Sequence, residues 1–184
     1  MLLTGSHFSI NIDTVMTDLI ILMSLLAGPA YGYSLKKTAG LIFGSGAIHN
    51  NIVYPSLKKF VRNGWVKQST VPGNRGQQRK QYQLTPAGKK HLFEQVEIFR
   101  EREAADDGAF LMRVALFDAL PAKKRVAIIE TRKSFLAARA AELAQLAELA
   151  PRKSSGALAL DRVQALVQNE LRWIAKIERD LQTG

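Results

Sequence analysis

Polar and cationic side chains gather on one side of a helix that the sequence predicts at about residues 51–63. They recur at steps of three and four, so they share one helical face. Amide and cationic side chains of this kind hydrogen-bond base edges and phosphates, and a tyrosine can donate to a phosphate. A charged face that merely contacts solvent explains the same spacing. The candidate contact residues are Asn51, Tyr54, Lys58, Lys59 and Arg62, with Pro55 in the first turn. A separate apolar stripe that would face a core comprises Val53, Leu57, Phe60 and Val61.

A basic turn follows this helix. Alternating side chains predict two strands, at residues 65–71 and 80–84, joined by a polar turn at 72–79. The glycines in the turn allow close approach to another surface. Cations at the tip of a two-stranded ribbon can reach a nucleic-acid backbone or a minor groove. The cations at this tip are Arg75, Arg79 and Lys80.

The charge is unevenly divided between the two halves of the chain. Residues 1–93 hold 11 Lys and Arg against only Asp13 and Asp18, a net charge of +9. Residues 94–184 hold 15 Lys and Arg against 14 Asp and Glu, a net charge of +1. This asymmetry favours the first half as the surface for a polyanion, although a merely basic domain has the same charge.

The spacing of apolar residues and the helix-breaking residues indicate the elements that position these groups. A first helix begins near Val15 and stops at Gly28-Pro29, and a short second helix with Lys36 on its polar side follows. The third helix ends at Gly64, and Thr85-Pro86 starts a helix that we expect to continue to about Asp106. Further helices are expected at 107–119, 122–149 and 157–182.

The order helix–helix–helix–strand–strand is that of a winged helix-turn-helix, whose third helix can enter a major groove. The predicted fold class is mainly α with a two-stranded β wing: a winged helix-turn-helix followed by a C-terminal helical dimerisation domain. Residues 1–10 are expected to be a flexible arm or a remnant of expression. Residues 11–93 would bind DNA, and residues 94–184 would dimerise and hold an effector site.

Four short motifs, in order over about residues 15–93, resemble the PadR family of transcriptional regulators. They are Leu25-Leu26-Ala27-Gly28-Pro29-Ala30-Tyr31-Gly32-Tyr33-Ser34-Leu35, Val53-Tyr54-Pro55-Ser56-Leu57, Asn63-Gly64-Trp65-Val66, and Arg79-Lys80-Gln81-Tyr82-Gln83-Leu84-Thr85-Pro86-Ala87-Gly88. The resemblance implies a dimeric winged-helix repressor that binds an operator and that a small molecule releases from DNA. It places Tyr54 and Pro55 in the recognition helix and Tyr31 in the turn before the second helix. We expect Gly32 to serve backbone geometry and Tyr33 to pack on the core. Asn51 stands where the family often has glycine, which leaves the start of the recognition helix open.

A seven-residue apolar repeat in the last helix predicts helix pairing. Such spacing favours helices packed nearly parallel or antiparallel, within one chain or between two. Reading two half-sites one duplex turn apart requires two copies, which favours the homodimer. An intramolecular hairpin is the alternative. The candidate dimerisation residues are Leu160, Val167, Leu171, Ile174 and Leu181.

Enzyme functions have little support in this sequence. The three histidines lie in separate segments without a HExxH pattern, and the chain has no cysteine. We therefore expect no catalytic residue, no metal site and no cofactor, and we interpret Asp106-Asp107 as a helix break. No apolar stretch approaches the ~20 residues that span a bilayer, so we expect a cytoplasmic protein with no membrane partner.

Aromatic residues of the second half could line a cavity for a small aromatic effector. They are Phe110, Phe117 and Trp173. Aromatic residues at helical spacing also pack in cores, and that alternative stays open. For the whole chain, the alternatives to a specific regulator are an architectural winged-helix protein that binds nucleic acid without sequence preference, and a small-molecule-binding protein without a true operator.

Overall fold

The structure is a computed structural model that describes residues 12–35, 37, 50–72, 77–149, 151 and 154–183. The chain forms two compact units, Met1–Val96 and Glu97–Gly184. None of the described helices is long and apolar enough to cross a membrane.

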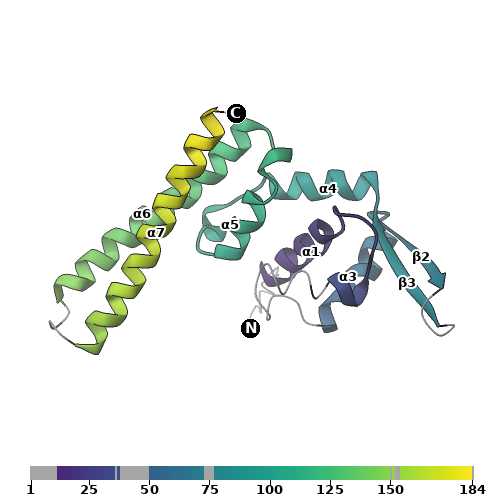
Figure 1. Ribbon diagram of the computed structural model, residues 1–184, viewed down its shortest axis with the longest axis horizontal. Helices are drawn as coiled ribbons and strands as arrows, with labels where there is room; N and C mark the ends of the chain where they lie inside the picture. The colour runs from purple at the N-terminus through teal and green to yellow at the C-terminus, as the bar shows by residue number, and fades with distance from the viewer. Residues whose placement is uncertain are drawn as a thin grey trace, which may run out of the picture. The chain divides into compact units, whose positions relative to one another are not determined.

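The N-terminal unit combines helices with a small antiparallel sheet (Figure 1). Residues 32–35 and 37 are also helical, where the sequence predicts the second helix. The predicted fold class is confirmed: a winged helix followed by a helical region. The elements are α1 (Ile12–Ser24), β1 (Ala30–Tyr31), α3 (Asn50–Arg62), β2 (Val66–Pro72), β3 (Gln78–Leu84) and α4 (Pro86–Val96).

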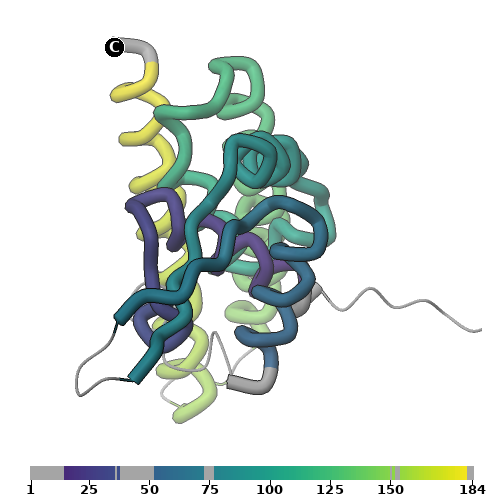
Figure 2. Tube along the Cα trace, turned by 90° about the vertical axis from the view of Figure 1, so that its right-hand side faces the viewer, coloured from purple at the N-terminus to yellow at the C-terminus, as the bar shows by residue number. Residues whose placement is uncertain are grey.

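The sheet has three strands in the order β1-β3-β2, one more than the two predicted. β1 pairs antiparallel with β3, with Ala30 opposite Tyr82 and Tyr31 opposite Gln81. A two-residue strand is too short to show a period of two, and only its pairing with β3 defines it. The tube view in Figure 2 shows β2 and β3 running together as a ribbon.

The core of this unit lies between α1, α3 and α4. Leu57 and Phe60 are fully buried, as the apolar stripe of the third helix predicts. Val61 is partly exposed, so the stripe is narrower than predicted. Apolar burial of this kind is the main favourable contribution to folding.

Turn and cap residues join α3 to the wing and the wing to α4. Gly64 ends α3 in the left-handed region at φ +72°, as predicted. Thr85 caps α4, because its Oγ1 accepts from the Gly88 N–H at 3.0 Å. The same hydroxyl donates to the Gly64 carbonyl at 2.7 Å, which ties the two junctions together.

The C-terminal unit is helical, and its boundaries differ from the prediction near residue 100. A helix continuing to Asp106 is wrong, because α4 ends at Val96 and Asp106 is the N-cap of the next helix. The Asp106 carboxylate accepts from the Ala109 N–H at 3.0 Å, which supports the interpretation of a helix break. The elements are a 3-10 helix (Glu101–Glu103), α5 (Asp107–Val114), a second 3-10 helix (Phe117–Ala119), α6 (Ala122–Leu149) and α7 (Ser155–Thr183).

The heptad stripe of the last helix is already covered within one chain. α6 and α7 pack side by side as a helical hairpin (Figure 1). Leu160, Val167 and Ile174 are buried there, whereas Leu171 and Leu181 are partly exposed. The intramolecular hairpin, which the sequence leaves as the alternative, is therefore what covers these three residues. Heptad spacing shows which side of a helix is apolar, but it does not show which helix covers that side.

Two buried arginines hold the beginning of the C-terminal unit in place. Arg113 donates to the Ile98 carbonyl at 2.6 Å and to Glu103 at 2.8 Å. Arg132 donates to the Ala104 carbonyl, to Asp107 and to Glu170. Burial lowers the pKa of Arg113, and Glu103 opposes that effect. Burial also acts to lower the pKa of Arg132, but its bonds to Glu170 and Asp107 outweigh it, so this pKa is raised.

Candidate nucleic-acid interface

A groove of about 730 Å³ crosses the N-terminal unit between α3 and the wing. Its walls come from the β1 turn, α3, β2 and β3, which are brought together from four parts of the chain. The lining residues are Tyr31, Gly32, Tyr33, Ser34, Tyr54, Lys58, Gln68, Arg79, Lys80 and Tyr82.

One wall is set by the turn that starts the second helix. The Ser34 hydroxyl accepts from the Tyr31 N–H at 3.1 Å and donates to the Tyr31 carbonyl at 2.8 Å. Ser34 lies in the first turn of the helix, and its hydrogen bonds to the backbone of Tyr31, the residue just before the helix, fix where the helix begins. Because Tyr31 also pairs with Gln81 of β3, the start of this helix is tied to the wing.

The two tyrosine motifs of the sequence meet at Gly32. A Cβ on Gly32 would lie 2.9 Å from Cε1 and 3.3 Å from Cζ of Tyr54. The absence of a side chain at this position therefore lets the Tyr54 ring lie against the backbone. The sequence predicts a role in backbone geometry for Gly32, but φ there is not in the left-handed region, and the close approach of Tyr54 explains the residue instead.

The groove is cationic and has no carboxylate in its lining. Lys58, Arg79 and Lys80 supply three positive charges, and half-exposed Tyr54 supplies a hydroxyl among them. Tyr82 closes the groove from β3, and burial, with a contribution from Tyr54, raises the pKa of its phenol. At neutral pH Tyr82 is therefore a neutral hydrogen-bonding group. An array of cations and hydroxyls suits a phosphate backbone.

Asp18 of α1 is paired with Lys59. Lys59 forms a salt bridge with Asp18 of α1 and lies 5.3 Å from the centroid of the Phe60 ring. This pairing neutralises both charges away from the groove. It also gives Lys59, which the sequence places among the contact residues, a second role that holds α3 to α1.

The groove brings together five residues that the sequence singles out for DNA binding: Tyr31, Tyr54, Lys58, Arg79 and Lys80. Pro55 and Arg62 are exposed on α3 but do not line it. Lys36 and Arg75 lie outside the described residues, and Asn51 lies in α3 with its side chain undescribed.

The sequence reasoning missed several lining residues. Tyr33 is 76% exposed at the edge of the groove, so the expectation that it packs on the core is wrong. Gln68 lies opposite Tyr82 across the β2–β3 ladder. A period of two does place Lys80 and Tyr82 on one face of the hairpin, and that pattern could have found Tyr82. Ser34 follows from no pattern, because its role depends on the fold of the turn.

A stacked pair of rings lies next to α3, since the Trp65 centroid is 6.0 Å from that of Phe60. The ring of His91 lies 3.6 Å from that of Trp65, nearly parallel to it at 12°. Burial lowers the pKa of His91, with a further contribution from Lys59, while Glu94 and Asp18 act to raise it. The neutral imidazole is therefore favoured.

No group of three or more metal-ligating side chains occurs in the described part of the chain.

The aromatic residues expected to hold an effector are packed in the C-terminal unit. Phe110 is 0% exposed, meets Trp173 edge-on at 5.9 Å and lies 6.1 Å from Phe99. Phe117 is buried as well. As they stand, Phe110 and Phe117 offer a ligand no free surface, and the aromatic spacing reflects core packing.

Comparison with known proteins decides the family. Residues 21–94 match the model described as the transcriptional regulator PadR-like family, and the match covers α3, the wing and most of α4. Residues 21–94 of this chain belong to the PadR-like family. Because the family is one of transcriptional regulators, its members are not enzymes. A search of curated protein sequences gave no match.

Solved structures of regulators show partial similarity. A candidate transcriptional regulator from Thermoplasma acidophilum is 31% identical over 44% of this chain and 77% of its own, with a TM-score of 0.41. Bacillus subtilis PadR in complex with operator DNA is 19% identical over 89% and 98%, with a TM-score of 0.42. The same protein in complex with p-coumaric acid is 17% identical over 92% and 97%, with a TM-score of 0.41.

Proposed function

We propose that this regulator is a homodimeric repressor that binds an operator in duplex DNA through the groove and is released by a small-molecule effector. The observation that carries the DNA-binding part is the groove itself, which combines three cations and several hydroxyls with no carboxylate. Residues 11–93 form the DNA-binding domain in this proposal, and residues 94–184 form the dimerisation and effector domain.

The two sides of the groove would have different roles. α3 would enter the major groove, where Asn51 and Lys58 can reach base edges and Tyr54 a phosphate. The wing, with Arg75, Arg79 and Lys80, would lie along the backbone or in a minor groove. Phosphate contacts set affinity and base contacts set sequence preference.

DNA titrations separate these roles. Fluorescence anisotropy with the duplex that flanks the protein's own gene, and with a shuffled duplex, gives specific and random affinity over a range of salt. Arg79→Ala should weaken binding to both duplexes and lower the slope of log affinity against log salt concentration by about one. Lys58→Ala should narrow the difference in binding free energy between the two duplexes by about 1–3 kcal/mol. Lys90→Ala is the matched control, because Lys90 is exposed on α4 and does not line the groove. Equal affinity for both duplexes at every salt concentration would contradict the proposal.

The dimer needs a surface other than the buried heptad stripe. Exposed leucines remain on both helices of the hairpin, and Leu149 and Leu158 are 81% and 71% exposed. Leu146 and Leu166 are about half exposed as well. The described part of the hairpin leaves these side chains uncovered, so we place the contact between copies on them.

Sedimentation velocity tests this placement. Leu158→Glu with Leu166→Glu should give monomers at micromolar concentration and weaken operator binding, because each half-site then binds alone. Wild-type protein that is monomeric and still binds its operator tightly would contradict the dimer.

The effector part of the proposal has a constraint from the structure. Phe110 and Phe117 are buried, so they could contact a ligand only if the elements packed on them moved, and Trp173, which meets Phe110 edge-on, is partly exposed. Trp173 fluorescence therefore reports such a movement, and Trp173→Phe should remove the ligand-induced change while Trp65→Phe should not. A ligand that releases DNA must bind the free form more tightly than the bound form.

A further inference from the structure

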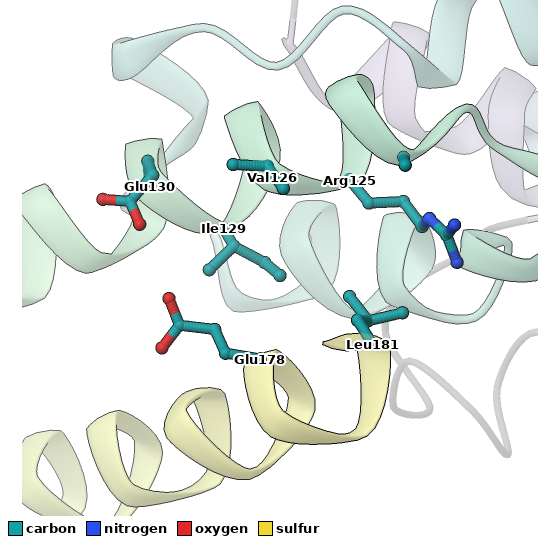
Figure 3. Close-up of a pocket in the computed structure, with 7 residues that line it drawn as sticks. Arg125, Val126, Ile129, Glu130, Glu178 and Leu181 are labelled. Carbon is teal, nitrogen blue, oxygen red and sulfur yellow. The ribbon is translucent and has the colours of Figure 1, made fainter. Parts of the chain in front are cut away.

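A small cavity lies between the beginning of α6 and the end of α7, away from the residues considered for an effector. Its volume is about 220 Å³, below the roughly 300–1,000 Å³ of sites for drug-sized ligands, so it suits a small molecule. Ile129 and Leu181 face each other across it (Figure 3). The lining residues are Ala122, Arg125, Val126, Ile129, Glu130, Glu178 and Leu181.

Arg125 provides a hydrogen-bond donor at one end of this cavity. Its Nε is buried and has no hydrogen-bond partner among the described residues. A buried donor without a partner is unfavourable, and such groups in native proteins call for an explanation. Figure 3 shows the guanidinium at the Leu181 end, away from both glutamates.

The two glutamates at the other end share one lysine, which offsets one of their two charges. Lys133 Nζ lies 2.7 Å from Glu178 and 3.3 Å from Glu130. The bond to Glu178 contributes most to raising the pKa of Lys133, so the lysine stays charged. The cavity therefore has at one end a cation without an ion pair among the described residues, an apolar middle, and at the other end two glutamates that share one lysine.

We infer that this α6–α7 cavity binds a small organic monocarboxylate with an apolar tail. The carboxylate accepts hydrogen bonds from the Arg125 guanidinium, including its buried Nε, and charge-assisted bonds of this kind are the strong ones. The tail lies against Val126, Ile129 and Leu181. A ligand with an amine in place of the carboxylate would meet the guanidinium with like charge.

Isothermal titration calorimetry of the full chain tests this inference with hexanoate as the probe. Hexanoate should bind saturably, at about 10 mM or below for a ligand of this size. 1-Hexanol should bind at least tenfold more weakly, and hexylammonium should not bind. Arg125→Gln should weaken hexanoate about tenfold or more and leave hexanol unchanged. Arg125→Lys should retain part of the affinity.

Arg162→Gln is the matched control, because Arg162 is exposed on α7 and does not line the cavity. Its hexanoate affinity should equal that of the wild type, and circular dichroism checks that each variant is folded. The inference is overturned if hexanoate shows no saturable binding or if hexanol binds as tightly as hexanoate. It is also overturned if Arg125→Gln and Arg162→Gln lose the same amount of hexanoate affinity. None of these outcomes depends on DNA binding, so they leave the proposed function separately testable.

Discussion

Gly88→Ala should destabilise the N-terminal unit although Gly88 lies in a helix. In an exposed helix interior this replacement usually stabilises by about 1 kcal/mol. Here a Cβ would lie 2.0 Å from the Trp65 carbonyl oxygen and 2.8 Å from its carbon. Real Cβ contacts essentially never fall below 3.0 Å, and the obstacle is backbone, which cannot rotate away.

The magnitude follows from what the Trp65 carbonyl holds. It accepts from the Thr85 N–H at 3.0 Å and, at 3.1 Å, shares with the Gly64 carbonyl the proton of the Thr85 hydroxyl. Moving it away strains both bonds, each of which contributes about 0.5–1.5 kcal/mol, and overpacking adds about 1–3 kcal/mol. Subtracting the gain of about 1 kcal/mol in helix propensity, we expect Gly88→Ala to lower the free energy of unfolding by about 2–3 kcal/mol.

Urea unfolding monitored by tryptophan fluorescence measures this loss. Trp65 and Trp173 are the two tryptophans of the chain, so a Trp173→Phe background reports on the N-terminal unit. Gly156→Ala in a Trp65→Phe background is the matched control. Its Cβ would meet only the Ser154 hydroxyl, at 3.7 Å, so this variant should be unchanged or more stable by up to about 1 kcal/mol. Unchanged or increased stability of Gly88→Ala would refute the reasoning.

Three other outcomes follow from burial and charge. The pKa of His91 in the folded protein lies below the ordinary 6.5, so the unfolded chain binds a proton first as the pH falls, and the N-terminal unit should lose stability below about pH 6.5. The difference in unfolding free energy between wild type and His91→Phe, measured over a range of pH, isolates this contribution. Parallel pH profiles of the two proteins would contradict it. Arg132→Met should lower the free energy of unfolding in urea by about 3 kcal/mol. This is near the lower end for breaking a buried ion pair, because Glu170 can be hydrated once Arg132 is gone. The double variant Arg132→Met with Glu170→Leu should recover part of this loss. Val167→Glu should lower the melting temperature equally at all protein concentrations, because Val167 is buried within one chain; a concentration-dependent loss would place it between chains.

Local signals were sufficient for much of the N-terminal unit. The left-handed glycine at Gly64, the cap at Thr85 and the alternation in β3 depend on a few consecutive residues, so the sequence alone predicts them correctly. The excess of cations at Lys58, Arg79 and Lys80 is likewise visible without coordinates. These features predict the winged helix and its cationic surface.

Contacts between distant residues decided the rest. The pairing of β1 with β3, the salt bridge of Lys59 with Asp18, and the Tyr54 ring on Gly32 each join segments more than 20 residues apart. Periodicity shows which side of an element is apolar or charged, but it cannot identify the partner on that side. The stripe through Val167 was therefore visible in the sequence, and only the tertiary structure showed that α6 covers it, because an apolar face gains the same burial from either chain.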